Sequence, residues 1–263
     1  MALKNFLLDL IFPRYCPGCK KEIASNRLSP ICDDCFDKIA LNSGIQCHVC
    51  GLRNNYSDCL PARDIPEGHK KCQKETSLQG IFSAGRYEDP ILREMIHLFK
   101  YQSVESFKTP LSRLIIGYLT KENLAEVFGE NGIVLSPIPL TLRRKIKRGF
   151  NQSELLAEEI GKFLNCPVAN LLKRKKFSGP QAEISDWKKR KENIFGAFAI
   201  NEPIFPILTK TAACRRRAAN FDGIKKVILV DDVSTSGATL EEAARVLKNA
   251  GIKEVYGIVA AKG

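Results

Sequence analysis

Apolar positions along the chain follow two patterns that predict alternating strands and helices. The unbroken aliphatic run from Val227 to Val230 is typical of a strand buried on both faces, whereas apolar residues between Pro90 and Tyr101 recur every three or four positions, as in an amphipathic helix. Alternation of this kind predicts an α/β fold, a parallel sheet with right-handed crossovers and ligands at the carboxyl ends of its strands. The expected order is strand 81–87, helix 90–101, helix 110–119, strand 133–140, helix 152–164, strand 168–172, the strand at 227, a helix from Thr239 to Gly251, and strand 255–261.

The segment after Val230 places two carboxylates, Asp231 and Asp232, at a strand end before a loop of small residues. Thr239 and Glu242 match a capping box at the start of the next helix. Backbone N–H groups at such a helix start can bind one phosphate, and both carboxylates are placed to reach ribose hydroxyls, directly or through a divalent cation. Gly237 and Ala238 would let the ligand approach closely. The predicted phosphate-binding residues are Ser234, Thr235, Ser236, Gly237, Ala238 and Thr239.

This segment resembles the signature of the type I phosphoribosyltransferases, in which an aliphatic strand, two acidic residues and a Thr-rich loop bind phosphoribosyl pyrophosphate. The resemblance implies a Mg²⁺-dependent transfer with Asp231 and Asp232 as the catalytic residues. A Walker phosphate loop does not occur in the chain, which disfavours an NTPase motor.

Positive charge is concentrated in one part of the chain. The net charge is +12, and residues 143–191 hold fourteen basic against five acidic residues. A basic loop is expected after Leu140, where Arg143, Arg144, Lys147 and Arg148 would neutralise a leaving pyrophosphate and Asn151 would cap the next helix. Basic runs interleaved with aromatic residues also suit a nucleic acid strand. The candidate nucleic-acid residues are Lys147, Arg174, Lys175, Lys176 and Arg190.

Eight of the ten cysteines lie between Cys16 and Cys72, and six of them form three C-x-x-C pairs. Four thiolates close a tetrahedral Zn²⁺ site with no open position, so these metals are expected to be structural. For the second ion His48 or His69 can replace one thiolate, and a cross-braced pairing is an alternative. Cys166 and Cys214 carry no such pattern and are expected to be ordinary thiols. The first expected set is Cys16, Cys19, Cys32 and Cys35, and the second is Cys47, Cys50, Cys59 and Cys72.

The expected domains are a module over residues 1–78, an amphipathic helix followed by a double zinc finger, and a phosphoribosyltransferase-like domain over 79–263. Asp9 interrupts the first apolar run, and no stretch approaches the roughly 18 apolar residues of a membrane span. We therefore expect a cytoplasmic protein with reduced cysteines.

Further motifs narrow the resemblance. The chain carries Arg148-Gly-Phe-Asn-Gln152, then Gln181, Arg190-x-x-Asn193 and Ala197-Phe198, ahead of the Asp-Asp strand and behind a cysteine-rich start. In this it resembles the ComF family of competence-associated phosphoribosyltransferase-like proteins over nearly its whole length. The resemblance implies single-stranded DNA as a partner in DNA uptake or utilisation, together with a competence helicase or other uptake machinery. The alternative is an active phosphoribosyltransferase of nucleotide or base salvage without a DNA role.

The chain departs from that family between Ile200 and Asp222, where a basic insertion stands in place of a brief connection. The insertion either extends a nucleic-acid surface or is a tolerated excursion, and the second interpretation is favoured.

Overall fold

The computed structural model describes residues 14–24, 27, 29–54, 72, 76–102, 104–128, 132–175, 194–201 and 223–263. Within them the elements follow in the order α2 (Asp33–Phe36), β1 (Ile45–Gln46), β2 (Arg53–Asn54), β3 (Ile81–Arg86), α4 (Pro90–Tyr101), η1 (Glu105–Phe107), α5 (Lys108–Lys121), α6 (Ala125–Phe128), β4 (Ile133–Pro137), α7 (Leu142–Arg148), α8 (Gln152–Leu164), β5 (Leu172–Arg174), β6 (Phe198–Ile200), β7 (Lys226–Ser234), α11 (Ala238–Asn249) and β8 (Glu254–Lys262).

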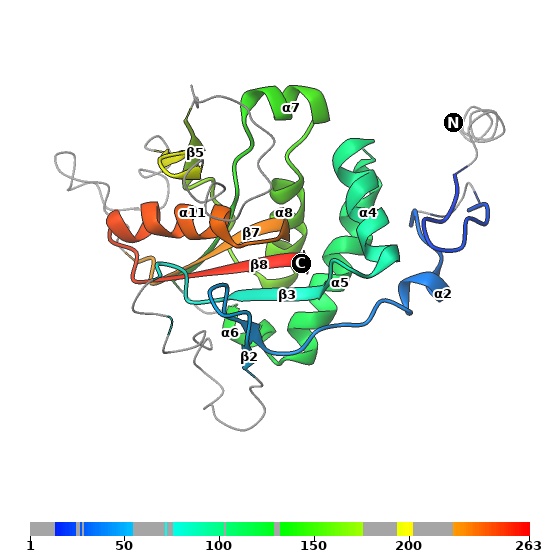
Figure 1. Ribbon diagram of the computed structural model, residues 1–263, viewed down its shortest axis with the longest axis horizontal. Helices are drawn as coiled ribbons and strands as arrows, with labels where there is room; N and C mark the ends of the chain where they lie inside the picture. The colour runs from blue at the N-terminus through cyan, green and yellow to red at the C-terminus, as the bar shows by residue number, and fades with distance from the viewer. Residues whose placement is uncertain are drawn as a thin grey trace.

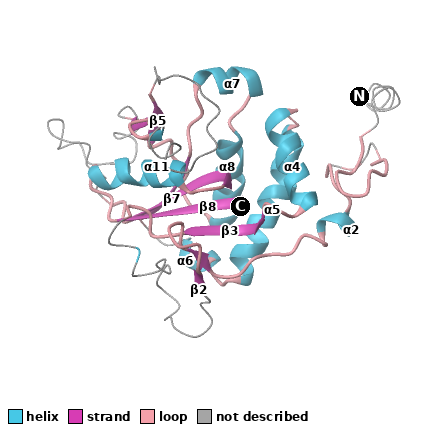
Figure 2. Ribbon diagram, in the orientation of Figure 1, coloured by secondary structure: helices cyan, strands magenta, loops and turns pink. Residues whose placement is uncertain are grey.

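The main sheet of the described residues has the strand order β2-β1-β3-β8-β7-β4 (Figures 1 and 2). Strands β3, β8, β7 and β4 pair in parallel, as expected, and β8 and β7 are the two inner strands of this parallel part. Strand β1 pairs antiparallel with β3 and with β2. The cysteine-rich part of the chain therefore extends the same sheet, and the domain boundary predicted after residue 78 falls between hydrogen-bonded strands. That boundary stays a prediction.

The two faces of the sheet carry separate cores, because successive side chains of β7 point in opposite directions. Ile228 and Val230 pack with helices α4, α5 and α8, while Val227 and Leu229 pack with α11 and the β5–β6 pair. All four side chains are fully buried, which explains why the run lacks polar alternation.

Helix α4 begins where its sequence predicts. The side chain of Asp89 accepts hydrogen bonds from the N–H groups of Ile91 and Leu92, and Pro90 occupies the first turn, where its missing N–H costs nothing. The apolar stripe of α4 is buried against the sheet. This packing places the last turn of α4, with Lys100, beside the end of β7.

Two local predictions were wrong. The strand expected over 168–172 does not form as such: Val168 makes only an isolated bridge to Leu135, and Leu172 starts β5, which pairs with β6 in a separate two-stranded sheet. The basic segment after Leu140 is not a loop but helix α7. Thr141 accepts a hydrogen bond from the N–H of Arg144 and Gly149 ends the helix in the left-handed conformation, so local capping decides the outcome.

None of the helices in these ranges is long and apolar enough to cross a membrane. The amphipathic helix expected over Met1 to Phe12 lies outside the described residues.

Candidate functional site

The two carboxylates at the end of β7 have different surroundings. Asp232 is only 3% exposed, and its Oδ1 lies 2.9 Å from Nζ of Lys100 on α4. A buried charge of this kind needs a partner, and the ion pair supplies it. Of the two acids expected to reach a ribose, Asp232 is therefore already engaged inside the protein, and Asp231 is the more available.

Asp231 is partly exposed and accepts a hydrogen bond of 2.8 Å from Oγ of Ser153, at the start of α8. Burial of the carboxyl group and the neighbouring charge of Asp232 raise its pKa from 3.8 to about 7, although Lys100 and Ser153 oppose the shift. The folded protein thus holds this proton more tightly than the unfolded chain does, so this group lowers stability as the pH rises from 3.8 to about 7. Such a cost is common at functional sites, where a cation or a substrate hydroxyl compensates for it.

The loop after β7 leads directly into helix α11. Gly237 is the N-cap, with φ of 77°, and it provides no side-chain cap, so the first N–H groups of the helix have no intrahelical acceptor. Oγ of Ser234 is buried and has no hydrogen-bond partner among the described residues. The N–H of Ala238 donates to Oγ of Ser236 at 3.4 Å, whereas the Ser234 hydroxyl and the positive end of the helix are available to an anion.

The predicted capping box is wrong. Helix α11 starts at Ala238 with Gly237 as its N-cap, whereas a capping box would need Thr239 as the N-cap. The carboxylate of Glu242 does not cap the helix. It accepts hydrogen bonds from the N–H of Gly196 at 2.8 Å and from the guanidinium of Arg245 at 2.7 Å. Glu242 thus ties α11 to the chain before β6 and leaves the helix start uncapped.

The segment from Arg148 to Ser153 connects α7 to the site. Nη1 of Arg148 donates to Oε1 of Gln152, whose Nε2 donates to the carbonyl of Phe99 in α4. The Asn151 side chain caps α8, as predicted, by accepting from the N–H of Ser153, and also donates to the carbonyl of Ile138. These contacts fix α8 so that Ser153 meets Asp231.

Arg174, predicted as a nucleic-acid residue, is half-buried rather than fully exposed. Its guanidinium lies 5.1 Å from the ring centroid of Phe198, in the β5–β6 pair. Burial lowers the pKa of Arg174, the charge of Arg144 lowers it further, and Asp231 raises it, so these three charged groups lie close enough to interact. Of the other predicted basic residues, Arg143, Arg144, Lys147 and Lys175 are exposed.

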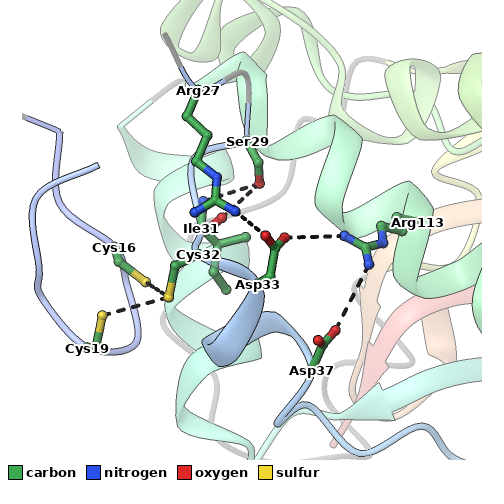
Figure 3. Close-up of polar contacts among 9 residues, drawn as sticks. All are labelled: Cys16, Cys19, Arg27, Ser29, Ile31, Cys32, Asp33, Asp37 and Arg113. Carbon is green, nitrogen blue, oxygen red and sulfur yellow. Dashed lines mark hydrogen bonds and ion pairs between the residues drawn. The ribbon is translucent and has the colours of Figure 1, made fainter. Parts of the chain in front are cut away.

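The first predicted cysteine cluster forms. The sulfur atoms of Cys16, Cys19, Cys32 and Cys35 all lie within 4.8 Å of one another. Sγ of Cys32 is 3.5 Å from that of Cys16 and 3.8 Å from that of Cys19, and Zn–S bonds of about 2.3 Å place tetrahedral sulfurs about 3.8 Å apart. The donor set therefore fits Zn²⁺. Figure 3 shows the sulfur atoms of Cys16, Cys19 and Cys32 from this set.

This cluster is attached to the body of the protein through α2. Arg113 of α5 lies 3.8 Å from Asp33 and 4.0 Å from Asp37 (Figure 3). Its guanidinium also lies 4.3 Å from the ring centroid of Phe36. The buried Cys16 and Cys35 pack in the same core as α4 and α5.

A second cluster brings together the sulfur atoms of Cys47, Cys50 and Cys72 within 4.8 Å. The fourth expected ligand, Cys59, and its alternative His69 lie outside the described residues. His48, the other alternative, does not replace a thiolate in this arrangement, because its Nε2 lies 3.2 Å from Oε2 of Glu241 in α11. Three thiolates in this spacing fit a metal site that needs one further ligand.

Several predicted residues lie outside the described part of the chain: Lys176, Arg190, Cys214 and the insertion up to Asp222. Cys166 is buried, and burial raises the pKa of its thiol to about 11, as expected for an unreactive core cysteine.

Sequence reasoning missed Lys100 and Ser153. Ser153 directly follows the Arg148–Gln152 motif, so its position carried a usable signal. Lys100 ends an apolar helix far from Asp232 in sequence, and no local pattern marks it as a partner. No pattern in the sequence predicts the contact of His48 with α11 either.

Two known domain families match parts of the chain. A phosphoribosyl transferase domain matches residues 147–263, and a double zinc ribbon domain matches residues 7–74. The chain is 29% identical to competence protein F of Haemophilus influenzae, covering 91% of this chain and 86% of that protein. It is 27% identical to competence protein ComFC of Bacillus subtilis, covering 84% and 79%, and 28% identical to the DNA utilization protein YhgH of Salmonella typhi, covering 86% and 93%.

Proposed function

We propose that this ComF-type protein binds phosphoribosyl pyrophosphate with Mg²⁺ and handles single-stranded DNA in competence or DNA utilisation. It has a phosphoribosyl transferase domain behind a double zinc ribbon. One observation carries the first half of this proposal. The raised-pKa carboxyl of Asp231 stands on the same strand as the unpartnered Ser234 hydroxyl, directly before the uncapped start of α11.

Each part of the ligand has a partner of suitable chemistry in this arrangement. The 5′-phosphate would accept hydrogen bonds from the loop 234–239, as predicted from the sequence. Asp231 would hold the ribose or the cation, since carboxylate oxygens are the ligands that Mg²⁺ prefers, and bound Mg²⁺ would neutralise pyrophosphate charge. Arg144, Arg148 and Arg174 would face the pyrophosphate. Asp232 would act through Asp231, by holding Lys100 beside it.

The pH dependence of binding tests this assignment. A carboxyl with a pKa of about 7 is ionised to about one tenth at pH 6 and to about nine tenths at pH 8. Affinity for Mg²⁺–phosphoribosyl pyrophosphate is therefore present above pH 7 and should fall about tenfold from pH 8 to pH 6, as measured by calorimetry. In Asp231→Asn protein this step should disappear, and the pH dependence that remains belongs to the ligand's own phosphates. Equal binding by wild-type and Asp231→Asn protein at pH 8 would remove Asp231 from the site.

The alternative of an active salvage enzyme uses the same residues. Pyrophosphate release in the presence of a nucleobase, with no affinity for DNA, would favour it over the proposed role. Binding without release fits a protein that senses or carries the ligand.

The DNA part of the proposal rests on the exposed basic residues of α7 and of the segment 173–175 at β5, and on the names of the relatives. Lys147 and Lys175 are both exposed, so replacing them by alanine removes phosphate contacts without disturbing a core. For single strands, each lost contact should reduce the slope of log K against log salt concentration by about 0.7. The double variant should thus show a slope smaller by about 1.4 in fluorescence anisotropy with labelled oligonucleotides.

A matched control replaces two exposed lysines elsewhere, Lys38 and Lys253. That variant has the same net charge as the Lys147/Lys175 variant and should keep the wild-type slope. If both variants lose the same amount, the effect is one of overall charge, and α7 and β5 are not the DNA surface.

A further inference from the structure

The second cysteine cluster lies directly against the candidate phosphate loop. His48 stands between the cluster residues Cys47 and Cys50, and its Nε2 lies 3.2 Å from Oε2 of Glu241 in the first turn of α11. The side chains of both residues are largely buried, His48 at 8% and Glu241 at 18% exposure. The contact is thus part of the packed interior rather than a surface ion pair, which would be worth little.

Gly237 makes this contact possible. A Cβ at Gly237 would lie 2.9 Å from Cβ of His48, closer than side chains pack. Gly237 also has φ of 77°, which favours glycine in its own right. The space that its missing side chain leaves is therefore occupied by His48, and the N-cap of α11 rests on the cysteine-rich segment.

A second connection reaches the same helix turn from the other end of the cluster. Glu241 accepts hydrogen bonds from the N–H groups of Ser77 at 2.8 Å and Leu78 at 3.1 Å. These residues follow Cys72 closely in the chain and lead into β3. Glu241 is thus held from both sides of the cluster, through His48 and through the backbone after Cys72.

The loop has a separate support behind it. Nζ of Lys262, at the end of β8, donates to the carbonyl of Thr235 at 3.2 Å, and the N–H of Gly263 donates to the carbonyl of Ser234 at 3.1 Å. These contacts hold the loop to the sheet. The start of α11, whose N–H groups would bind the phosphate, depends instead on Glu241, His48 and Gly237.

We propose that His48 is a positioning residue that couples metal binding at Cys47, Cys50 and Cys72 to the order of the loop 234–239 and so to its affinity for a phosphate group. With the metal bound, the turn that carries His48 has one conformation and holds the first turn of α11 in place. Without the metal, the turn is free to move and the start of α11 loosens. The effect on phosphate affinity, the ligand half of this inference, rests on the proposed function. The effect of the metal and His48 on the order of the loop, the structural half, does not.

Hydrogen exchange tests the structural half without any ligand. In Cys50→Ser protein, which should bind one zinc ion fewer, the amides of Ser77, Leu78 and Glu241 should exchange about tenfold faster than in the wild type. The His48→Ala variant should show the same acceleration while keeping the wild-type zinc content, because His48 is not a ligand. A His48→Gln variant, whose amide can still donate to Glu241, should restore most of the protection. Amides of α8 serve as an internal reference and should not change.

The matched control is Cys19→Ser, which removes an exposed ligand of the first cluster. It should lower zinc content without accelerating exchange at Glu241. Equal acceleration in Cys19→Ser and Cys50→Ser would indicate general loosening and overturn the coupling. Unchanged exchange in His48→Ala would overturn the role of His48.

Calorimetry with Mg²⁺–phosphoribosyl pyrophosphate tests the ligand half. His48→Ala should weaken binding about tenfold, His48→Gln much less, and Cys166→Ser, which lies outside both clusters, not at all. If the wild-type protein does not bind this ligand, the proposed function fails while the exchange results still decide the coupling. If it binds and His48→Ala binds equally well, the coupling to affinity is wrong and the proposed function stands.

Discussion

Replacing Lys100 by methionine is expected to destabilise the protein by about 3 to 5 kcal/mol, because it leaves the buried carboxylate of Asp232 without its partner. Methionine has a similar length and keeps the packing of the aliphatic stem, so the loss should report charge rather than volume. The unpaired Asp232 would also stand beside Asp231, whose pKa Lys100 helps to lower. Urea unfolding at pH 8 measures the effect.

The double variant Lys100→Met/Asp232→Asn shows whether the loss of stability comes from the unpaired charge of Asp232 or from the loss of the ion pair itself. Removing both charges should recover most of the lost stability, since a buried ion pair gains little over neutral groups of the same shape. A loss below about 1 kcal/mol in the single variant would mean that solvent reaches Asp232 and that the pair is not buried.

Removing zinc is expected to have the largest effect on the cysteine-rich part of the protein. Structural zinc sites supply folding free energy, with apparent values of about 10 to 16 kcal/mol in isolated zinc-finger peptides. Here Ile23, Ile31 and Ile39 near the first cluster pack in the same core as α4 and α5, so releasing the metal should expose apolar surface. A chelator or Cys35→Ser should therefore lower the thermal midpoint and increase dye binding to exposed apolar surface.

Cys166→Ser is the matched control for this experiment. Cys166 is equally buried but stands outside both clusters, so its replacement should leave the zinc content unchanged. Metal analysis of the wild type, Cys35→Ser and Cys166→Ser gives the comparison. Protein whose thermal midpoint is the same with and without chelator would contradict a structural role for zinc.

The limits of sequence reasoning are clearest at Asp231 and Asp232. Adjacent identical residues at a strand end gave no reason to separate them, and both were expected to face the ligand. The position of α4 decides otherwise, because Lys100 reaches Asp232 while Ser153 reaches Asp231. Long-range packing of two helices therefore gives two carboxylates different environments.

Glu242 illustrates the same limit for a short motif. Thr239 and Glu242 have the spacing of a capping box, but the N-cap of the helix is Gly237, two residues before the position that this motif requires. The carboxylate of Glu242 instead accepts hydrogen bonds from Arg245 and from the N–H of Gly196. The contact with Gly196, which is distant in the sequence, could not be predicted from the local motif.

Features with local causes could be predicted from the sequence. The aliphatic run of β7, the Asn151 helix cap and the C-x-x-C spacing of the first cluster all depend on neighbours a few residues apart, and all form as predicted. Three other contacts follow from the tertiary structure: Lys100 neutralises Asp232, the guanidinium of Arg174 packs over Phe198, and His48 packs on Gly237. Each of these contacts joins residues far apart in the chain, and burial, which sets the strength of their charges, exists only once the sheet and its helices have assembled.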